Sequence, residues 1–194
     1  VWMVFCKSQA SHCYTDRMKN LVPDMLAEHL NVVFCGSALG DVSWKRRAYY
    51  ANKGNCFWPT LAEVGLTPRR MAPEEYPMVT AFGIGLTDLV KTDHGQDAHI
   101  FDGHVDLVAA RASLRRKILR WQPGVLAFTS RTVARQVLDR PATCGRQPET
   151  IGQTILWVLP STSGLARRFF DIAPWRDLAC FVRASFPRDE SCIH

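Results

Sequence analysis

Three acidic residues lie where a carboxylate could carry out acid–base chemistry. Asp88 lies near the end of the otherwise apolar segment 82–90, Asp41 follows a glycine-bracketed loop, and Asp93 precedes His94. Burial at the end of an apolar segment raises the pKa of an aspartate unless a donor or a cation compensates for the lost water. Asp88 could therefore accept a hydrogen bond from a ligand, orient a water molecule, or do both. The alternative is a local cap or turn, in which the carboxylate binds backbone N–H groups.

The histidines offer weak evidence for a metal site. His94, His99 and His104 recur every five residues, a spacing that does not repeat on one face of a helix, and no cysteine or acidic set completes the ligands. The seven cysteines contain no C-x-x-C pair, which favours buried or inert thiols in a reducing compartment. We therefore expect no metal and no cofactor.

Four short apolar segments are typical of the buried strands of a parallel sheet: 30–35, 82–90, 125–128 and 154–159. Segments with helical spacing or helix-end signals alternate with them: 57–64, a segment that begins at Pro73, 105–121, 131–138 and 175–184. Thr129 and Ser130 can cap the helix 131–138. The polar stretch 140–150 is predicted as a loop. This alternation indicates an α/β fold with a parallel sheet covered on both faces.

Ligands of such folds bind at the carboxyl ends of the strands. Three loops therefore form the candidate site: 36–41, 88–93 and 161–167. Ser37 and Ser161 offer hydroxyls that could hold a water or a phosphate, although small hydroxyls in loops usually satisfy local backbone.

The composition limits the possible classes of protein. The chain has 194 residues, 47% of them hydrophobic and 22% charged, with a formal net charge of +6. A disordered chain is excluded, as is a disulfide-framed miniprotein, and no apolar run approaches the roughly 18 residues of a membrane span. The first residues lack the pattern of a signal peptide, and the positive charge points to an anionic partner. We expect one domain over 18–194 behind an N-terminal extension, 1–17, and a cytoplasmic location, nucleoid-associated in a bacterium.

Four stretches, taken in order, resemble the motifs of the uracil-DNA glycosylases: 35–40 (CGSALG), 50–58 (YANKGNCFW), 83–90 (GIGLTDLV) and 157–167 (WVLPSTSGLAR). The sequence is most similar to the mismatch-specific uracil/thymine branch, over about residues 31–184. The Asn-x-Phe-Trp turn and the Ser-Gly-Leu-x-Arg loop are the specific parts. The resemblance implies a three-layer α/β/α domain with a four-stranded parallel sheet. It also implies hydrolysis of the N-glycosidic bond of a base flipped out of DNA.

The first motif departs from the family pattern. Ala38 stands where the mismatch-specific branch has an Asn that holds the attacking water, and where another branch has an Asp. An Ala here is similar to some iron–sulfur members that use an acid elsewhere, yet the four-cysteine spacing of a cluster is absent. Gly40 takes the position of a Tyr that excludes thymine, so the resemblance implies room for larger or modified bases. Ser37 is a further base-binding candidate.

The resemblance assigns roles beyond the first motif. Tyr50 aligns with the ring on which the flipped base stacks, Asp88 with the Asn that reads the uracil edge, and Ser161 with the His or Asn of the last motif. Leu165 aligns with the residue wedged into the duplex gap. For Tyr50 the alternative is core packing, and for Leu165 it is a side chain folded onto the sheet edge.

Since Ala38 cannot activate water, another acid near the sugar has to stabilise an oxocarbenium-like transition state. Asp88 is the first candidate for this catalytic role and Asp41 is the second. The pair Asp93 and His94 is a third, less favoured candidate, because such pairs are common on surfaces.

Basic residues flank the predicted wedge and suit phosphate contacts. The DNA contacts predicted in this loop are Ser161, Ser163, Gly164, Leu165, Arg167 and Arg168. Lys45 and Arg46, in the basic stretch 44–50, are further candidates. The Arg-rich part of the helix 105–121 is more simply a solvated face.

We expect a monomeric DNA glycosylase that excises uracil, and other deaminated or modified bases, from single- or double-stranded DNA without a cofactor. The alternative is a non-catalytic binder of uracil-containing or abasic DNA, in which Ala38 marks lost hydrolysis. Asp88 separates the two, because a retired enzyme has no need for an acid in that pocket. A different nucleotide-binding enzyme is less favoured, since the sequence has no G-x-G-x-x-G or GK[ST] motif.

Overall fold

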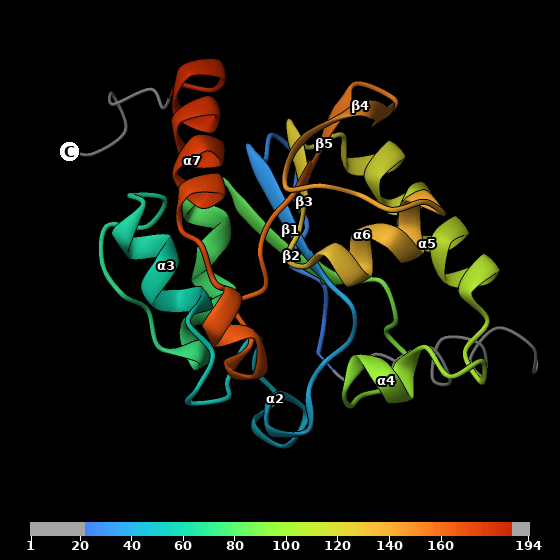
Figure 1. Cartoon of the computed structure of the whole chain (residues 1–194). Helices are drawn as coiled ribbons and strands as arrows, with labels where there is room; N and C mark the ends of the chain where they lie inside the picture. The colour runs from blue at the N-terminus through green and yellow to red at the C-terminus, as the bar shows by residue number, and fades with distance from the viewer. Residues whose placement is uncertain (1–21, 188–194) are drawn as a thin grey trace, which may run out of the picture.

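The computed structural model describes residues 22–187, so the predicted extension 1–17 lies outside the described residues. The chain forms a five-stranded sheet with helices on both faces, as Figure 1 shows. The helical elements are α2 (Asp41–Arg46), α3 (Phe57–Glu63), η1 (Pro73–Phe82), α4 (Asp97–Ile100), α5 (Leu107–Trp121), α6 (Arg131–Leu138), η2 (Gly164–Phe169) and α7 (Ala173–Ser185).

Four parallel strands form the body of the sheet: β1 (Val32–Gly36), β2 (Ile84–Asp88), β3 (Val125–Phe128) and β5 (Thr154–Val158). They correspond to the four apolar segments that predicted strands, and the spatial order of the whole sheet is β2-β1-β3-β5-β4. Every residue of β1, β2 and β3 is buried, as expected for strands covered on both faces. The predicted α/β fold and its parallel sheet are therefore confirmed.

The fifth strand, β4 (Gly145–Ile151), corrects the prediction of a four-stranded sheet and of a polar loop over 140–150. It pairs antiparallel with β5 at the edge of the sheet, with an irregular register between Arg146 and Thr150. Most of its residues are exposed or only half-buried. An edge strand of this kind lacks the apolar run by which a buried strand is found in a sequence.

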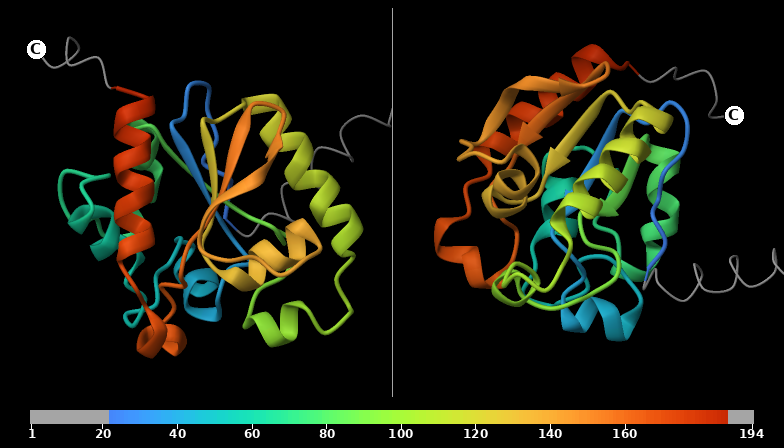
Figure 2. Two further views of the ribbon diagram at one scale, coloured as in Figure 1. Left: turned by 45° about the horizontal axis from the view of Figure 1, so that its top comes forward. Right: turned by 90° about the vertical axis from the view of Figure 1, so that its right-hand side faces the viewer.

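Helices cover the two faces of the sheet in three layers, which the two views of Figure 2 also show. On one face α3, α7 and η1 enclose a core that includes Phe34, Trp58 and Trp175. On the other face α5 and α6 enclose a core that includes Val33 and Leu114. Val33 and Phe34 are neighbours in β1, and alternate residues of a strand point to opposite faces. Strand β1, which is buried on both faces, therefore contributes side chains to both cores.

The segment before β2 differs from its prediction. The helix that begins at Pro73 is a 3-10 helix, η1, which runs to Phe82. Pro77 lies inside it and lacks the N–H group that an α-helix would use there. Gly83, with a φ of 65°, follows the last helical residue. The strand therefore begins at Ile84 rather than at residue 82.

The predicted cap of α6 is confirmed, because the Ser130 hydroxyl accepts a hydrogen bond from the Val133 N–H at 3.2 Å. Ser130 follows β3 after one residue, so the cap also fixes the backbone at the carboxyl end of the sheet. Within residues 22–187, no helix has the length and apolar character needed to cross a membrane.

Candidate active site

A cleft of about 840 Å³ lies at the carboxyl ends of the parallel strands, where the fold class predicts a ligand. It brings together the loops after β1, β2, β3 and β5, at the end of the molecule near α2 and α4 in Figure 1. Predicted site residues that line it are Ser37, Ala38, Gly40, Asp41, Tyr50, Asp88, Ser161, Ser163, Gly164 and Leu165. A smaller cavity of about 380 Å³, lined by residues of α5, α6, β4 and β5, contains none of these residues.

Asp88 occupies the buried end of this cleft. It is the last residue of β2, lies in register with Gly36 of β1, and is only 3% exposed. A Cβ atom on residue 36 would lie 2.5 Å from Asp88 Oδ1. Glycine at position 36 therefore leaves space for this carboxylate, and any Cβ atom there would force it to move.

A chain of charges lies behind Asp88. Its Oδ2 atom is 3.5 Å from Lys91 Nζ, an ion pair without hydrogen-bond geometry, and makes no hydrogen bond among the described residues. Lys91 Nζ lies 3.1 Å from Asp24, which Lys117 Nζ approaches to 2.6 Å. Burial raises the pKa of Asp88 to about 6, and the positive charge of Lys91 opposes that rise. This acid consequently titrates close to neutral pH.

Tyr50 lies beside Asp88 and combines packing with exposure to the cleft. Its ring stacks on Phe57 with centroids 3.8 Å apart and planes 19° apart. Its hydroxyl donates a long hydrogen bond, 3.5 Å, to Thr129 Oγ1. Tyr50 therefore packs against the core, which was the alternative to a base-stacking role, and it also lines the cleft.

Asp97, which was not predicted from the sequence, is a third acid in the lining of the cleft. It opens the short helix α4 and lines the cleft, as Ser37 also does. Burial raises the pKa of Asp97, and the polar Ser37 side chain opposes that rise. Asp97 stands in a polar stretch without periodicity, so local sequence gave no sign that the chain returns it to the first loop. Ala38, which also lines the cleft, has no polar side chain.

Asp41, the second predicted acid, lies at the exposed mouth of the cleft. Its side chain is 63% exposed, and Oδ1 lies 3.0 Å from His94 Nδ1. The His94 ring stacks on Trp44, with centroids 4.1 Å apart. Asp41 therefore belongs to a cluster of three side chains with His94 and Trp44, and it is far more exposed to water than Asp88.

The rim of the cleft carries two exposed apolar side chains on η2. Leu165 is 81% exposed and Phe169 is 80% exposed, and both line the cleft. The exposure of Leu165 excludes the alternative in which it folds onto the sheet edge. Phe169 was missed, because an aromatic residue in a helical segment is more often part of a core.

The loop before η2 is fixed by close backbone contacts. The Cys56 N–H donates to the Thr162 carbonyl at 3.0 Å, and a Cβ on Gly164 would lie 3.2 Å from the Gly54 carbonyl oxygen. The Ser161 hydroxyl accepts a hydrogen bond from the Ser163 N–H at 3.2 Å, so this side chain satisfies local backbone. These contacts hold the base of the rim while η2 projects from it.

The predicted basic contacts lie outside the lining of the cleft. Arg167 and Arg168 are on η2 beside the exposed apolar residues, whereas Lys45 and Arg46 are on α2. Arg46 already donates to Glu74 Oε1 at 2.9 Å and to the Ala51 carbonyl at 2.9 Å. Its guanidinium is thus occupied by contacts within the protein.

Comparison with known proteins agrees with this geometry. The family model of the uracil DNA glycosylase superfamily matches residues 23–182. The fold is similar to that of a proposed uracil DNA glycosylase from Methanosarcina acetivorans, solved by solution NMR, with a TM-score of 0.56 and 24% sequence identity. That match covers 84% of this chain and 95% of the other. The chain belongs to the uracil DNA glycosylase superfamily.

Proposed function

We propose that this protein is a DNA glycosylase that hydrolyses the N-glycosidic bond of uracil flipped out of DNA. Superfamily membership supports a glycosylase-type function. The observation that carries the specific proposal is Asp88, an acid buried at the closed end of the cleft against Gly36. A nucleobase with its sugar fits a cleft of this kind, which has one acid at its end and aromatic and hydroxyl groups on its walls.

The chemistry proposed for Asp88 is electrostatic and hydrogen-bonding. As the glycosidic bond breaks, positive charge develops on the sugar, and an ionised carboxylate nearby stabilises it. With a pKa of about 6, Asp88 is mostly ionised at neutral pH. It can then accept a base N–H, orient the attacking water, or do both. Ala38 cannot share this work.

Asp97 supports a second assignment of the water-orienting role. Its carboxylate lies beside Ser37, in the wall that also contains Ala38. In this division of roles Asp88 binds the base and Asp97 positions the water. Asp41 remains a catalytic candidate on the sequence alone. Its exposure favours neither binding of the base nor positioning of the water.

We propose that the rim holds the DNA. Leu165, with Phe169, fills the space that the flipped base leaves in the stack. Arg167 and Arg168 then meet phosphates on either side of that gap. Two exposed apolar side chains on a short helix have no role in the core, and a DNA partner would bury them.

The proposed base range is wider than uracil. Gly40 has open space where its Cβ would stand, since no heavy atom lies within 4 Å of that point. The resemblance places a ring here that would reject substituents at the base C5. Deaminated or enlarged bases are therefore proposed as further substrates.

A non-catalytic binder of uracil-containing or abasic DNA is the second candidate function, and Ala38 in the first loop is the observation that favours it. The test uses duplexes with U·A or U·G and a uracil-containing single strand, incubated with protein and then treated with alkali. We expect strand scission at the uracil, and none in a matched thymine duplex. Binding without scission on all three substrates would overturn the enzyme proposal and leave the binder.

A further inference from the structure

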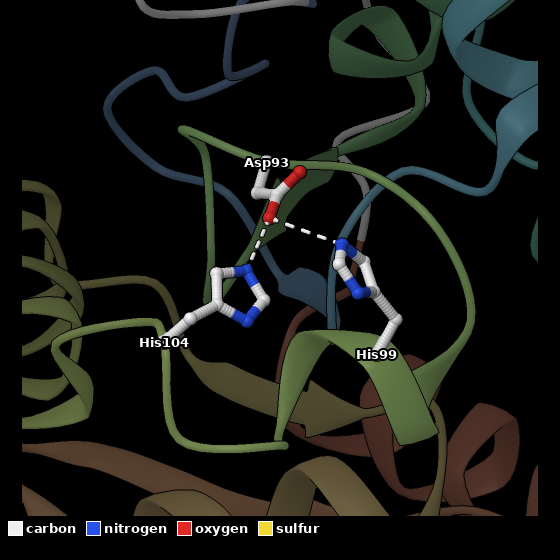
Figure 3. A group of neighbouring side chains, drawn as sticks. All are labelled: Asp93, His99 and His104. Atoms are coloured by element: carbon white, nitrogen blue, oxygen red, sulfur yellow. Dashed lines mark hydrogen bonds and ion pairs between the residues drawn. The ribbon is translucent and has the colours of Figure 1, made fainter.

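Two histidines and an aspartate form a cluster outside the active-site chemistry described above. Asp93 follows β2, His99 lies on α4, and His104 lies in the turn before α5. One ligand atom from each residue lies within 4.8 Å of the others. Figure 3 shows the three side chains converging, with both imidazole rings directed at the carboxylate.

The distances place one carboxylate oxygen between two imidazole nitrogens. Asp93 Oδ2 lies 2.6 Å from His104 Nε2 and 3.6 Å from His99 Nε2. The two rings stack with centroids 4.6 Å apart and planes 28° apart. Both Nε2 atoms therefore lie on the same side of the cluster, as ligands of one ion must.

The atoms that face away from this point have partners of their own. Asp102 contacts the Nδ1 atoms of both rings: it hydrogen-bonds His104 Nδ1 and lies 3.7 Å from His99 Nδ1. Asp93 Oδ1 accepts the His94 N–H at 2.7 Å. Metal-binding histidines usually have their second ring nitrogen held by a carboxylate, which fixes the orientation of the ring. The cluster thus contains three ligand atoms and also the groups that would orient them.

We propose that Asp93, His99 and His104 bind one divalent first-row transition ion, of which Zn²⁺ is the natural probe. Two imidazoles and one carboxylate are borderline ligands that suit zinc, whereas Mg²⁺ and Ca²⁺ prefer oxygen ligands alone. Three protein ligands leave one position of a tetrahedral ion for water. The sequence predicts no metal site here, because the histidine spacing fits no single helix face and no acidic ligand set is apparent beside it. These residues lie on a loop, a short helix and a turn.

A bound ion would join both ends of the segment that contains α4. Asp97 and its neighbours on that segment line the cleft. The ion would therefore stabilise the folded state, by an amount that grows with the logarithm of its free concentration divided by its Kd. It would also hold this wall of the cleft in place. This inference does not depend on the proposed glycosylase activity, because its test measures binding.

The test is calorimetric titration of Zn²⁺ into the metal-stripped full-length protein, with thiols kept reduced. We expect one equivalent to bind, and its binding to be lost in His99→Gln and His104→Gln. Asp102→Asn should bind about 10- to 100-fold more weakly, as for other groups that orient metal ligands. His29→Asn is the matched control, because it removes an exposed histidine elsewhere and keeps a residue type that tolerates its φ of 59°.

A second measurement separates this site from the cysteines. Co²⁺ should give the visible d–d bands of a four-coordinate ion without the strong near-ultraviolet charge-transfer band of a thiolate ligand. Unfolding curves without metal check that each variant folds. A thiolate band for the single equivalent, unchanged binding in both histidine variants, or no binding at millimolar Zn²⁺ would each overturn the proposal.

Discussion

The closed end and the rim of the cleft differ in burial and in the number of contacts that hold their side chains. At the closed end Asp88, Gly36 and Tyr50 are held by strand register, by contact and by a neighbouring cation. At the rim, Leu165 and Phe169 project into solvent on a short 3-10 helix. At the closed end, burial of a carboxylate is unfavourable for the folded state. At the rim, exposure of two apolar side chains to water is unfavourable. A rigidly held, buried carboxylate is typical of a catalytic group. An exposed apolar surface is typical of a site that binds a partner.

Replacement of the acid at the closed end is expected to have the largest effect. Asp88→Asn keeps the shape of the side chain and removes its charge, so single-turnover excision from a uracil duplex should fall about 10²- to 10⁴-fold. Asp41→Asn, at the mouth, should stay within a few-fold of wild type. Near-wild-type turnover in Asp88→Asn, with loss in Asp97→Asn, would move the catalytic acid to α4.

Removal of the cation beside Asp88 should lower the free energy of unfolding more than removal of an exposed ion pair. Lys91→Met leaves Asp88 buried without its cation, whereas Asp24 keeps Lys117. Removal of one partner of a buried ion pair costs about 3–5 kcal/mol of unfolding free energy. The matched control is Arg176→Met, which removes an exposed pair with Glu63 and should cost less than about 1 kcal/mol. Urea unfolding at pH 8 measures both. Equal losses would mean that burial does not distinguish the two pairs.

The pH dependence tests the same carboxylate without a mutation. The pKa of Asp88 rises from 3.8 to about 6 on folding, so its contribution to stability is fully present below 3.8 and is lost as pH rises through about 6. Excision needs the ionised form, so it should fall roughly tenfold per pH unit below 6. Asp88→Asn should remove both effects. A rate limb well below pH 6 would instead assign the ionisation to an acid other than Asp88.

The rim should give the smallest effect and one that depends on the substrate. Leu165→Ala removes apolar contact worth about 1.5 kcal/mol, so excision from a duplex should slow roughly tenfold. A single strand has no stack to fill, and its excision should change little. Phe169→Ala in the same background tests whether the two side chains act together. Equal losses on duplex and single strand would assign Leu165 to folding rather than to the wedge.

The difference between the closed end and the rim also explains what the sequence could predict. The four parallel strands and Asp88 follow from apolar runs, because burial on both faces leaves a local pattern. Asp97 and the Arg46–Glu74 contact could not be found this way, since each depends on segments far apart in the chain. Leu165 was found because the resemblance named it. Phe169 carries no local mark that separates an exposed phenylalanine from a buried one.

The edge strand β4 has a consequence for self-association. A free, flat sheet edge is a template for pairing with another chain. Here the outer strand carries Arg146, Pro148 and Glu149, and its register with β5 is interrupted. At the opposite edge, residue 25 bridges β2 through two backbone hydrogen bonds with Leu86. Both borders of the sheet thus carry features that oppose the addition of a strand from another molecule.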